Sequence, residues 1–329
     1  MKKNLIITNK SDIFYLTGFY SNSNDAILYL TPKVKYFITD GRFINQFKEQ
    51  VKGYKLIVSK KDKYKTLNSL LKEESYVSYD QISYKDYKKL NVNLKDSKNY
   101  ILKKRAVKNK KEIEYIKKAC DISQKSLLNT FKKIKSGITE IELKNILEEE
   151  MNKLGSEYPA FETIVASGPT NGASPHAIPT QRKIKEGEFI TIDFGATYNN
   201  YCSDITRTIA FKSINKKQKD IYNTVLKAKR LCEKSLQPGI KFKVLNNIAK
   251  KVINKSNNPF LHSIGHGIGI DIHEKPTINQ KLRNGNIHTI EPGIYIPKFG
   301  GVRIEDDYLI NKNGYINLTN KITDELIIL

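Results

Sequence analysis

The sequence of 329 residues contains few cysteines, few histidines and no long hydrophobic segment. Cys120, Cys202 and Cys232 are scattered and never spaced as CxxC, so we expect reduced, small core residues rather than disulfides or a cysteine metal site. The first apolar run stops after Ile7, and no apolar stretch approaches the ~18 residues of a membrane span. We therefore expect a soluble, cytoplasmic protein that has no membrane partner.

Arginine is also scarce. It accounts for only seven of the 57 basic residues, although the net charge is +23. Such a charge invites a nucleic-acid function, but Arg reads phosphates and bases better than Lys does. The lysines are spread along the chain beside many Asn and Ile, which is typical of a general bias in amino-acid composition. We expect no specific nucleic-acid partner.

The hydrophobic content of 39% is sufficient for a real core, and the length predicts two domains or one large α/β domain. Residues 1–103 alternate short apolar runs with polar turns, which predicts a small α/β domain. Its expected strands are 4–8, 26–30, 35–39, 54–58 and 76–80, and its expected helices are 41–50 and 64–74. Residues 93–109 are predicted to form a hinge.

Residues 104–329 show a different pattern, and we expect a second domain of the α/β (α+β) class. Apolar residues recur at helical spacing from Lys110 onward. A helix is predicted over 140–154, opened by Thr139 and closed by Gly155. Strand and hairpin signals follow, with further helices near 216–235 and 241–255.

Two acidic residues lie in a predicted hairpin, "EFITIDFGATYNNYCSDITRTIAF". If its turn is centred between residues 198 and 199, Asp193 and Asp204 face each other directly, while the isoleucines point to the opposite face. Two opposed anions repel unless a cation lies between them. The alternative is a different register in which both acids are solvated.

A second hairpin, "HTIEPGIYIPKFGGVRIEDDYLI", repeats this arrangement. If its turn is centred on Lys298, Glu291 opposes Glu305. Four carboxylates and His266 would form an oxygen-rich set that suits Mn²⁺, with Co²⁺, Fe²⁺ or Zn²⁺ possible. Their charge favours two divalent ions at a separation of ~3.5–4 Å.

Glycines surround His266 in "GHGIG". A Cβ on Gly265 or Gly267 would crowd the metal, water and substrate, so we expect glycine to provide space at the site.

Seven segments carry a resemblance to a known family: "YLTGF", "ITDGRF", "FETIVASG", "TIDFGATYNNYCSDITRT", "GHGIGIDIHE", "EPGIYIP" and "GGVRIEDD". The chain resembles the pita-bread metallopeptidases over nearly its whole length, and within them the Xaa-Pro peptidases, aminopeptidase P and prolidase. The resemblance implies a small N-terminal creatinase-like domain followed by a pita-bread catalytic domain. It also implies a homodimer.

The resemblance further implies a role for each candidate ligand. Asp193 would bind one metal ion and His266 with Glu291 the other, while Asp204 and Glu305 would bridge the two. Water held between two cations loses a proton near neutral pH and attacks the scissile carbonyl. Glu291 would then carry a proton to the leaving nitrogen.

Four other positions match family residues or depart from them. His273 and His176 would contact the substrate or the tetrahedral intermediate, where an imidazole donor stabilises a developing oxyanion. Arg303 would either pair with Asp193 or bind a substrate carboxylate. Phe161 replaces a Tyr of some aminopeptidases P, so that hydroxyl is absent. His262 and His288 have no matching role, and we interpret both as structural or surface residues.

The predicted function is removal of the N-terminal residue from short peptides with Pro at position two, an Xaa-Pro aminopeptidase activity. We prefer it because "GGVRIEDD" and "FETIVASG" resemble that group more. The alternative within the branch is an Xaa-Pro dipeptidase (prolidase). Methionine aminopeptidase lacks the N-terminal α/β domain, and creatinase does not use this metal set. The alternative of another class is a catalytically silent pita-bread protein that binds protein or RNA, for which ligand loss would be the signature.

Overall fold

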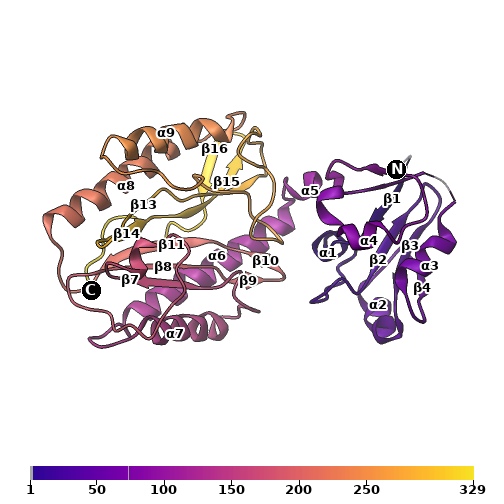
Figure 1. The fold of residues 1–329 in the computed structure, drawn as a ribbon, viewed down its shortest axis with the longest axis horizontal. Coiled ribbons are helices and arrows are strands. Elements are labelled where there is room, and N and C mark those ends of the chain that lie inside the picture. Colours follow the sequence, from indigo (N-terminus) through magenta and orange to yellow (C-terminus); the bar gives the residue numbers. More distant parts are fainter. Residues whose placement is uncertain (1–2, 73) are drawn as a thin grey trace. The chain divides into compact units, whose positions relative to one another are not determined.

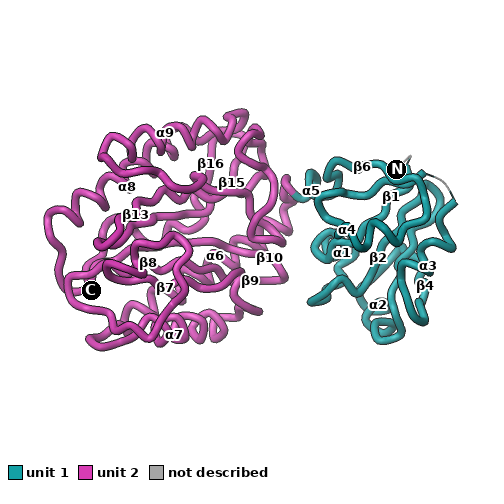
Figure 2. Tube along the Cα trace, viewed as in Figure 1, with its two compact units in different colours: residues 1–105 teal, residues 106–329 magenta. Residues whose placement is uncertain are grey.

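The computed structural model describes residues 3–72 and 74–329. The chain divides into two compact units, Met1–Arg105 and Ala106–Leu329 (Figures 1 and 2). This division lies two residues from the boundary predicted at 103/104. Within the described residues, no helix combines the length and apolar character that crossing a membrane requires.

The first unit is built on one mixed sheet with the strand order β4-β3-β2-β1-β5-β6. Its strands are β1 (Asn4–Ile7), β2 (Ile27–Leu30), β3 (Lys35–Thr39), β4 (Lys55–Val58), β5 (Ser75–Val77) and β6 (Leu94–Asp96). Its helical elements are α1 (Lys10–Thr17), η1 (Gly41–Phe43), α2 (Ile44–Gln50), α3 (Lys63–Leu70), η2 (Tyr79–Gln81), α4 (Tyr84–Tyr87) and α5 (Tyr100–Arg105). Alternate residues of β1 enter separate cores, Leu5 and Ile7 on one face and Ile6 on the other, so both faces of the sheet are buried.

The structure confirms the five strands predicted in this unit, and the two predicted helices appear as η1 with α2 and as α3. Position 73 of the second predicted helix lies outside the described residues. The division between the two units falls within the predicted hinge at 93–109, but β6 and α5 occupy most of that segment. Helix α5 is fixed by Ile101, which is buried, and by Arg105, whose Nη1 lies 2.7 Å from Oδ1 of Asp12.

The second unit places its helices outside two groups of strands (Figure 1). One half contains the sheet β11-β8-β7 and the pair β9-β10, covered by α6 and α7, and the other contains the sheet β12-β15-β16 and the pair β13-β14, covered by α8 and α9. The helical elements are α6 (Lys110–Phe131), α7 (Glu140–Lys153), η3 (Asn171–Ala173), α8 (Lys216–Ser235) and α9 (Phe242–Asn254). The strands are β7 (Ile164–Ser167), β8 (Phe189–Phe194), β9 (Thr197–Tyr198), β10 (Tyr201–Cys202), β11 (Ile205–Ala210), β12 (Ile287–Ile290), β13 (Gly293–Ile296), β14 (Gly300–Arg303), β15 (Asp306–Asn311) and β16 (Gly314–Asn317).

Local capping explains why the helix predictions here are accurate. Thr139 accepts a hydrogen bond from the main-chain N–H of Glu142, whose side chain in turn accepts from the N–H of Thr139. This capping box starts α7. Gly155 follows the helix with a φ of +97°, a conformation that favours glycine.

The register of the first predicted hairpin is wrong by one pair. The two central turn residues are Asn199 and Asn200, both with positive φ, as a two-residue type I′ turn requires. Asp193 therefore pairs with Thr206, two residues beyond Asp204. Because side chains alternate, Asp204 and Thr206 share a face, and Asp193 and Asp204 are diagonal neighbours. Asp204 is buried, so the solvated alternative is also wrong for it.

The register of the second hairpin is confirmed. Lys298 lies in its turn with a φ of +62°, and Gly293 pairs with Arg303 while Ile290 pairs with Asp306. The two ladders share one register, so Glu291 lies opposite Glu305 in the gap between them. Each glutamate thus occupies the break between a strand of one ladder and a strand of the next.

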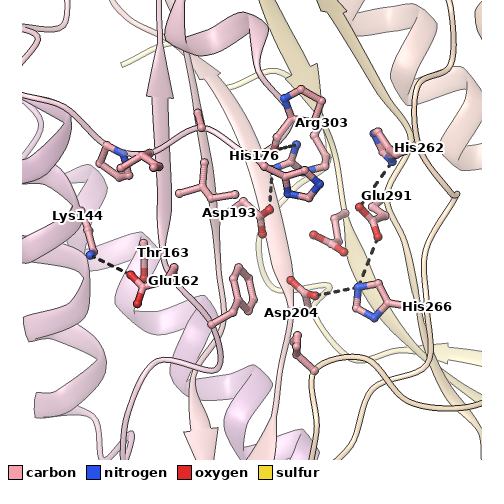
Figure 3. Close-up of a pocket in the computed structure, with 18 of the residues that line it drawn as sticks. Lys144, Glu162, Thr163, His176, Asp193, Asp204, His262, His266, Glu291 and Arg303 are labelled. Atoms are coloured by element: carbon pink, nitrogen blue, oxygen red, sulfur yellow. Dashed lines mark hydrogen bonds and ion pairs between the residues drawn. The ribbon is translucent and has the colours of Figure 1, made fainter. Parts of the chain in front are cut away.

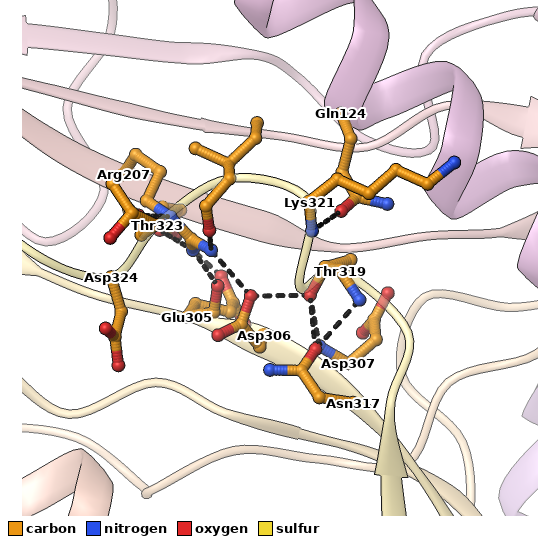
Figure 4. Close-up of polar contacts among 12 residues, drawn as sticks. Gln124, Arg207, Glu305, Asp306, Asp307, Asn317, Thr319, Lys321, Thr323 and Asp324 are labelled. Atoms are coloured by element: carbon orange, nitrogen blue, oxygen red, sulfur yellow. Dashed lines mark hydrogen bonds and ion pairs between the residues drawn. The ribbon is translucent and has the colours of Figure 1, made fainter.

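A buried cluster of charges holds β11, β15 and α8 together (Figure 4). Nη2 of Arg207 lies 2.8 Å from Oδ1 of Asp306, and Nζ of Lys229 lies 2.7 Å from its Oδ2. Arg207 also donates to main-chain oxygens of Glu305 and Thr323. Burial alone would raise the pKa of Asp306, but the two facing cations hold it below its ordinary value. The carboxylate is therefore the centre of this cluster.

We predict that Asp306→Ala lowers the free energy of unfolding by about 3–5 kcal/mol, because it leaves Arg207 and Lys229 buried without their partner. Unfolding in urea with excess chelator measures this loss without a contribution from metal binding. The same change at the exposed Asp220 of α8 is the control and should cost less than about 0.5 kcal/mol.

The pH dependence has a definite sign. A lowered folded-state pKa contributes stability above the unfolded value of about 3.9 and loses it as the pH falls through the folded value. The difference between wild type and Asp306→Ala should therefore shrink only below about pH 4. Equal stability of the two proteins at pH 7 would contradict the assignment.

Candidate active site

The five candidate ligands come from separate parts of the second unit and converge on one cavity of about 840 Å³ (Figure 3). Asp193 is on β8 and Asp204 precedes β11. His266 lies in the segment between α9 and β12, while Glu291 and Glu305 lie at the two strand breaks described above. Strand ends on both halves of the unit therefore supply the carboxylates, and a loop supplies the imidazole.

His266 lies among the acids. Its Nε2 is 3.4 Å from Oδ2 of Asp204 and 3.5 Å from Oε1 of Glu291. Ligand atoms of Asp204, His266 and Glu305 all lie within 4.8 Å of one another. This spacing fits a shared cation, and Asp193 and Glu291 flank the group in the same cavity.

Several carboxylate oxygens here are buried and have no hydrogen-bond partner among the residues that the structure describes. These atoms are Oδ1 of Asp193, Oδ1 of Asp204 and Oε1 of Glu305. Burial, reinforced by Asp193 and the other neighbouring carboxylates, raises the pKa of Asp204 and Glu305 well above the ordinary range. Burial likewise raises the pKa of Glu291 to about 7. Bound cations would satisfy these oxygens and reverse the shifts, so the residues fit a metal centre.

The second oxygen of two ligands is already oriented by protein donors. Thr206 Oγ1 donates to Oε2 of Glu305 over 2.6 Å, and Arg303 Nη2 donates to Oδ2 of Asp193 over 2.6 Å. Each side chain therefore keeps one oxygen fixed and one oxygen free for a cation. Such outer hydrogen bonds orient metal ligands.

The sequence left two roles open for Arg303, and the structure contains the ion pair with Asp193, in which Nη2 lies 2.6 Å from Oδ2. The guanidinium also donates from Nη1 to the hydroxyl of Tyr295 over 2.5 Å and from Nε to Oγ1 of Thr206 over 3.1 Å. Arg303 is buried. Tyr295 was not predicted as a site residue, although it lies within the quoted segment "EPGIYIP".

The glycines beside His266 are required, but for a different reason than predicted. A Cβ on Gly265 would lie 2.3 Å from the main-chain oxygen of Thr289, and Gly265 has a φ of +150°. A Cβ on Gly267 would lie 2.6 Å from the main-chain oxygen of Lys275. Glycine therefore lets the His266 segment pack against its own neighbouring backbone rather than making space for a ligand.

The other histidines divide into two groups. His273 lines the cavity with its ring 4.0 Å from that of His266, and desolvation lowers its pKa to about 4. His176 also lines the cavity but is exposed on a loop. His288 is buried against Phe242, with ring centroids 3.7 Å apart, and lies outside the cavity.

His262 is a cavity residue that the sequence interpretation missed. Its Nε2 lies 3.1 Å from the hydroxyl of Tyr295, and its Nδ1 lies 3.9 Å from Oε2 of Glu291. Burial lowers its pKa to about 4, so its ring is neutral near pH 7. Its position four residues before His266 was the only available signal, and the intervening chain is not helical, so spacing alone does not reveal the contact.

The cavity is also lined by apolar side chains, among them Phe161, Ile164 and Ile141. Away from the ligands it is lined by Lys144, whose Nζ lies 3.7 Å from Oε2 of the exposed Glu162 (Figure 3). The cavity therefore combines charged groups that can hold ions with apolar side chains that can contact a substrate.

The sequence matches two family models. Residues 114–312 match the metallopeptidase family M24, and residues 3–107 match the creatinase/prolidase N-terminal domain. The chain is 37% identical to a protein named Xaa-Pro dipeptidase from Pyrococcus furiosus, and the alignment covers 96% of this chain and 92% of that protein.

Solved structures show the same similarity. The Xaa-Pro dipeptidase from Bacillus anthracis is 33% identical with a TM-score of 0.94, covering 99% of this chain and 95% of that one. The X-Pro aminopeptidase from Thermotoga maritima is 30% identical with a TM-score of 0.90, covering 99% of this chain and 96% of that one. With the family model matched over most of the second unit, the chain belongs to metallopeptidase family M24 and carries a creatinase/prolidase N-terminal domain ahead of a pita-bread catalytic domain.

Proposed function

We propose that this protein is an Xaa-Pro dipeptidase that uses two divalent metal ions. The observation that carries the proposal is the complete set of five ligands around one cavity, in a chain whose relatives are named for Xaa-Pro hydrolysis. The sequence motifs favoured the aminopeptidase. The relatives favour the dipeptidase alternative, because the similar Pyrococcus furiosus and Pyrococcus horikoshii proteins are both named Xaa-Pro dipeptidase.

The metal ligands are assigned as the family resemblance implies. Asp193 would hold one ion, His266 and Glu291 would hold the other, and Asp204 and Glu305 would serve both. Two divalent ions bound here would supply Lewis acidity and a nucleophile at neutral pH. We favour manganese because oxygen ligands predominate.

The surrounding side chains provide the remaining functions. Glu291 carries a proton to the leaving nitrogen, and His273, neutral near pH 7, donates to the developing oxyanion. His176 and His262 are assigned to the substrate's proline carboxylate, which a dipeptidase must recognise. Arg303 holds Asp193 in place and orients it. Apolar lining residues such as Phe161 contact the side chain of the first residue.

The peptide class follows from the chemistry of proline. An Xaa-Pro bond is a tertiary amide, so its nitrogen offers no N–H to a peptidase. A site that binds the carbonyl oxygen and the free α-amino group does not need that contact. We further propose a cytoplasmic homodimer without a specific nucleic-acid partner, on the basis of the sequence and the family resemblance.

The metal assignment predicts that Asp204→Ala and Glu305→Ala each abolish activity and reduce metal content, because each removes a proposed bridge. Elemental analysis after dialysis and a peptidase assay measure both effects. The control is Glu162→Ala, which removes an exposed carboxylate at the other end of the cavity and should retain the metal. Full activity of Asp204→Ala after chelator dialysis would overturn the site.

We predict that His273→Ala keeps its metal content while kcat falls by roughly 10²–10³, the size expected for losing one transition-state donor. His273→Gln retains an N–H donor and should recover part of the loss. Loss of metal in His273→Ala would instead identify His273 as a ligand.

Substrate length decides between the two Xaa-Pro activities. We expect kcat/KM for Ala-Pro to exceed that for Ala-Ala by at least tenfold, which corresponds to about 1.4 kcal/mol, and to exceed that for Ala-Pro-Ala. Faster cleavage of Ala-Pro-Ala would establish the aminopeptidase alternative. A proline preference below tenfold would contradict both activities.

A further inference from the structure

Glu140 is a fully buried acid that the mechanism does not use. It is the first residue of α7 and has no exposed surface. Among the residues that the structure describes, no Lys, Arg or His lies within ion-pair distance of it. The N-terminus of a helix favours a negative charge, but a buried carboxylate also requires hydrogen bonds to both oxygens.

Five donors provide those hydrogen bonds, and all belong to one segment, residues 167–180. Oε1 accepts from the main-chain N–H of Ser167 over 2.7 Å and from its hydroxyl over 2.8 Å. Oε2 accepts from Nδ2 of Asn171 over 2.6 Å, and from the N–H and hydroxyl of Thr180 over 3.0 and 2.8 Å. Glu140 therefore closes the base of the loop at residues 168–179.

This loop forms part of the wall of the active-site cavity. Pro175, His176, Ala177 and Ile178 all line the cavity. The main-chain oxygen of Pro175 accepts a hydrogen bond from Nη1 of Arg303 over 3.2 Å. Within the loop, Asn171 Nδ2 also donates to the main-chain oxygen of Ile178 over 3.1 Å. One carboxylate thus joins the start of the loop, its internal brace and its end.

His176 depends on this framework for its position. Its side chain is exposed, and within the described residues it makes no hydrogen bond of its own. The position of any contact between His176 and the substrate therefore depends on the position of the loop that carries His176. Misplacement of a contacting group by about 1 Å can cost 10²-fold in rate.

We propose that Glu140 is a positioning residue that fixes the 168–179 loop and thereby holds His176 against the substrate. The activity part of this inference rests on the proposed Xaa-Pro hydrolysis, whereas the ordering of the loop does not. Glu140 acts through the loop and contacts neither the metal ligands nor the cavity.

Glutamine is the most informative substitution at this position. It has the same shape as glutamate, but one acceptor oxygen becomes an NH₂ group with two donors. Three of the five groups facing Glu140 are N–H groups that can only donate, and each carboxylate oxygen accepts from at least one of them. Whichever end holds the NH₂ therefore faces an N–H donor instead of accepting from it. A buried donor left without an acceptor is costly, and one end of the loop base should open.

The control is Glu150→Gln, the same change ten residues later on α7. Glu150 is also buried, but its partners are Lys133, Lys153 and Asn129, which lie outside the cavity lining. A general weakening of α7 should affect both variants, whereas a specific loop anchor should affect only Glu140→Gln.

The first measurement is hydrogen exchange of the main-chain amides, which requires no substrate. Exchange at residues 169–179 should rise about tenfold or more in Glu140→Gln and stay at the wild-type rate in Glu150→Gln, with metal content unchanged in both. Wild-type exchange of the loop in Glu140→Gln would overturn the anchor. Because this readout is independent of activity, it stands even if the protein fails to cleave Xaa-Pro peptides.

The second measurement is a double-mutant cycle on kcat/KM for Ala-Pro. Glu140→Gln should lower kcat/KM by about 10- to 100-fold. In a His176→Ala background the same change should cost less than about threefold, since the positioned group is already gone. Additive losses would show that Glu140 acts on activity by some route other than His176 and would overturn this part of the inference.

If Glu140→Gln does not fold, Thr180→Val tests the same anchor more gently. It removes one hydroxyl donor from Oε2, while the N–H of Thr180 still donates. A smaller rise in loop exchange, with a non-additive loss against His176→Ala, would support the proposal. Wild-type exchange in this folded variant would contradict it.

Discussion

The crowding of four carboxylates in one cavity is the constraint on which the catalytic unit depends. Asp204 and Glu305 are almost fully buried, and each has an oxygen without a protein partner. Like charges at such separations cannot all remain ionised without compensation. Arg303 compensates Asp193 directly, and bound divalent ions are the natural compensation for the others. The fold therefore assembles a group of carboxylates that repel one another without cations and are stabilised when cations bind.

Two ladders hold these acids at fixed positions. Glu291 and Glu305 lie at matching breaks between paired strands, and Thr206, paired with Asp193, also binds Glu305. Behind them, Arg207 donates to the main-chain oxygen of Glu305 and contacts Asp306. The backbone of a ligand is thus tied to a buried ion pair, which limits how far its carboxylate can move. Sites supported by strands and outer hydrogen bonds keep such geometry better than sites on loops.

The histidines around the metal centre are supported differently. His262, His273 and His176 lie on connecting segments, where side chains can reach a substrate but backbone order must come from elsewhere. His262 has Tyr295 as a partner, whereas His176 makes no hydrogen bond with the part of the chain that the structure describes. The buried carboxylate of Glu140 accounts for the order of that loop. Strand ends therefore carry the four acidic candidate ligands, whereas loops carry His266 and the groups assigned to the substrate.

The sequence by itself determined the elements and the chemistry of the site. Helix α7 is bounded by Thr139 and Gly155, because caps and left-handed glycines act within a few residues. Alternation assigned the acids to a shared face. The predicted register of the first hairpin was wrong by one pair, because the two turn residues are Asn199 and Asn200, which both adopt positive φ. This error moves each residue's partner by two positions along the strand. Asp204 was therefore still assigned to the correct face of the hairpin.

The tertiary structure alone decided contacts between residues far apart in the chain. The pairing of Arg303 with Asp193 and the approach of His262 to Tyr295 span 110 and 33 residues. The joining of Glu140 to Ser167 and Thr180 has no local signal either. The sequence indicated that the glycines around His266 are required. It did not indicate that they make room for the main chain at Thr289 and Lys275. Periodicity and capping are local, whereas these contacts depend on how separate strands and loops pack together.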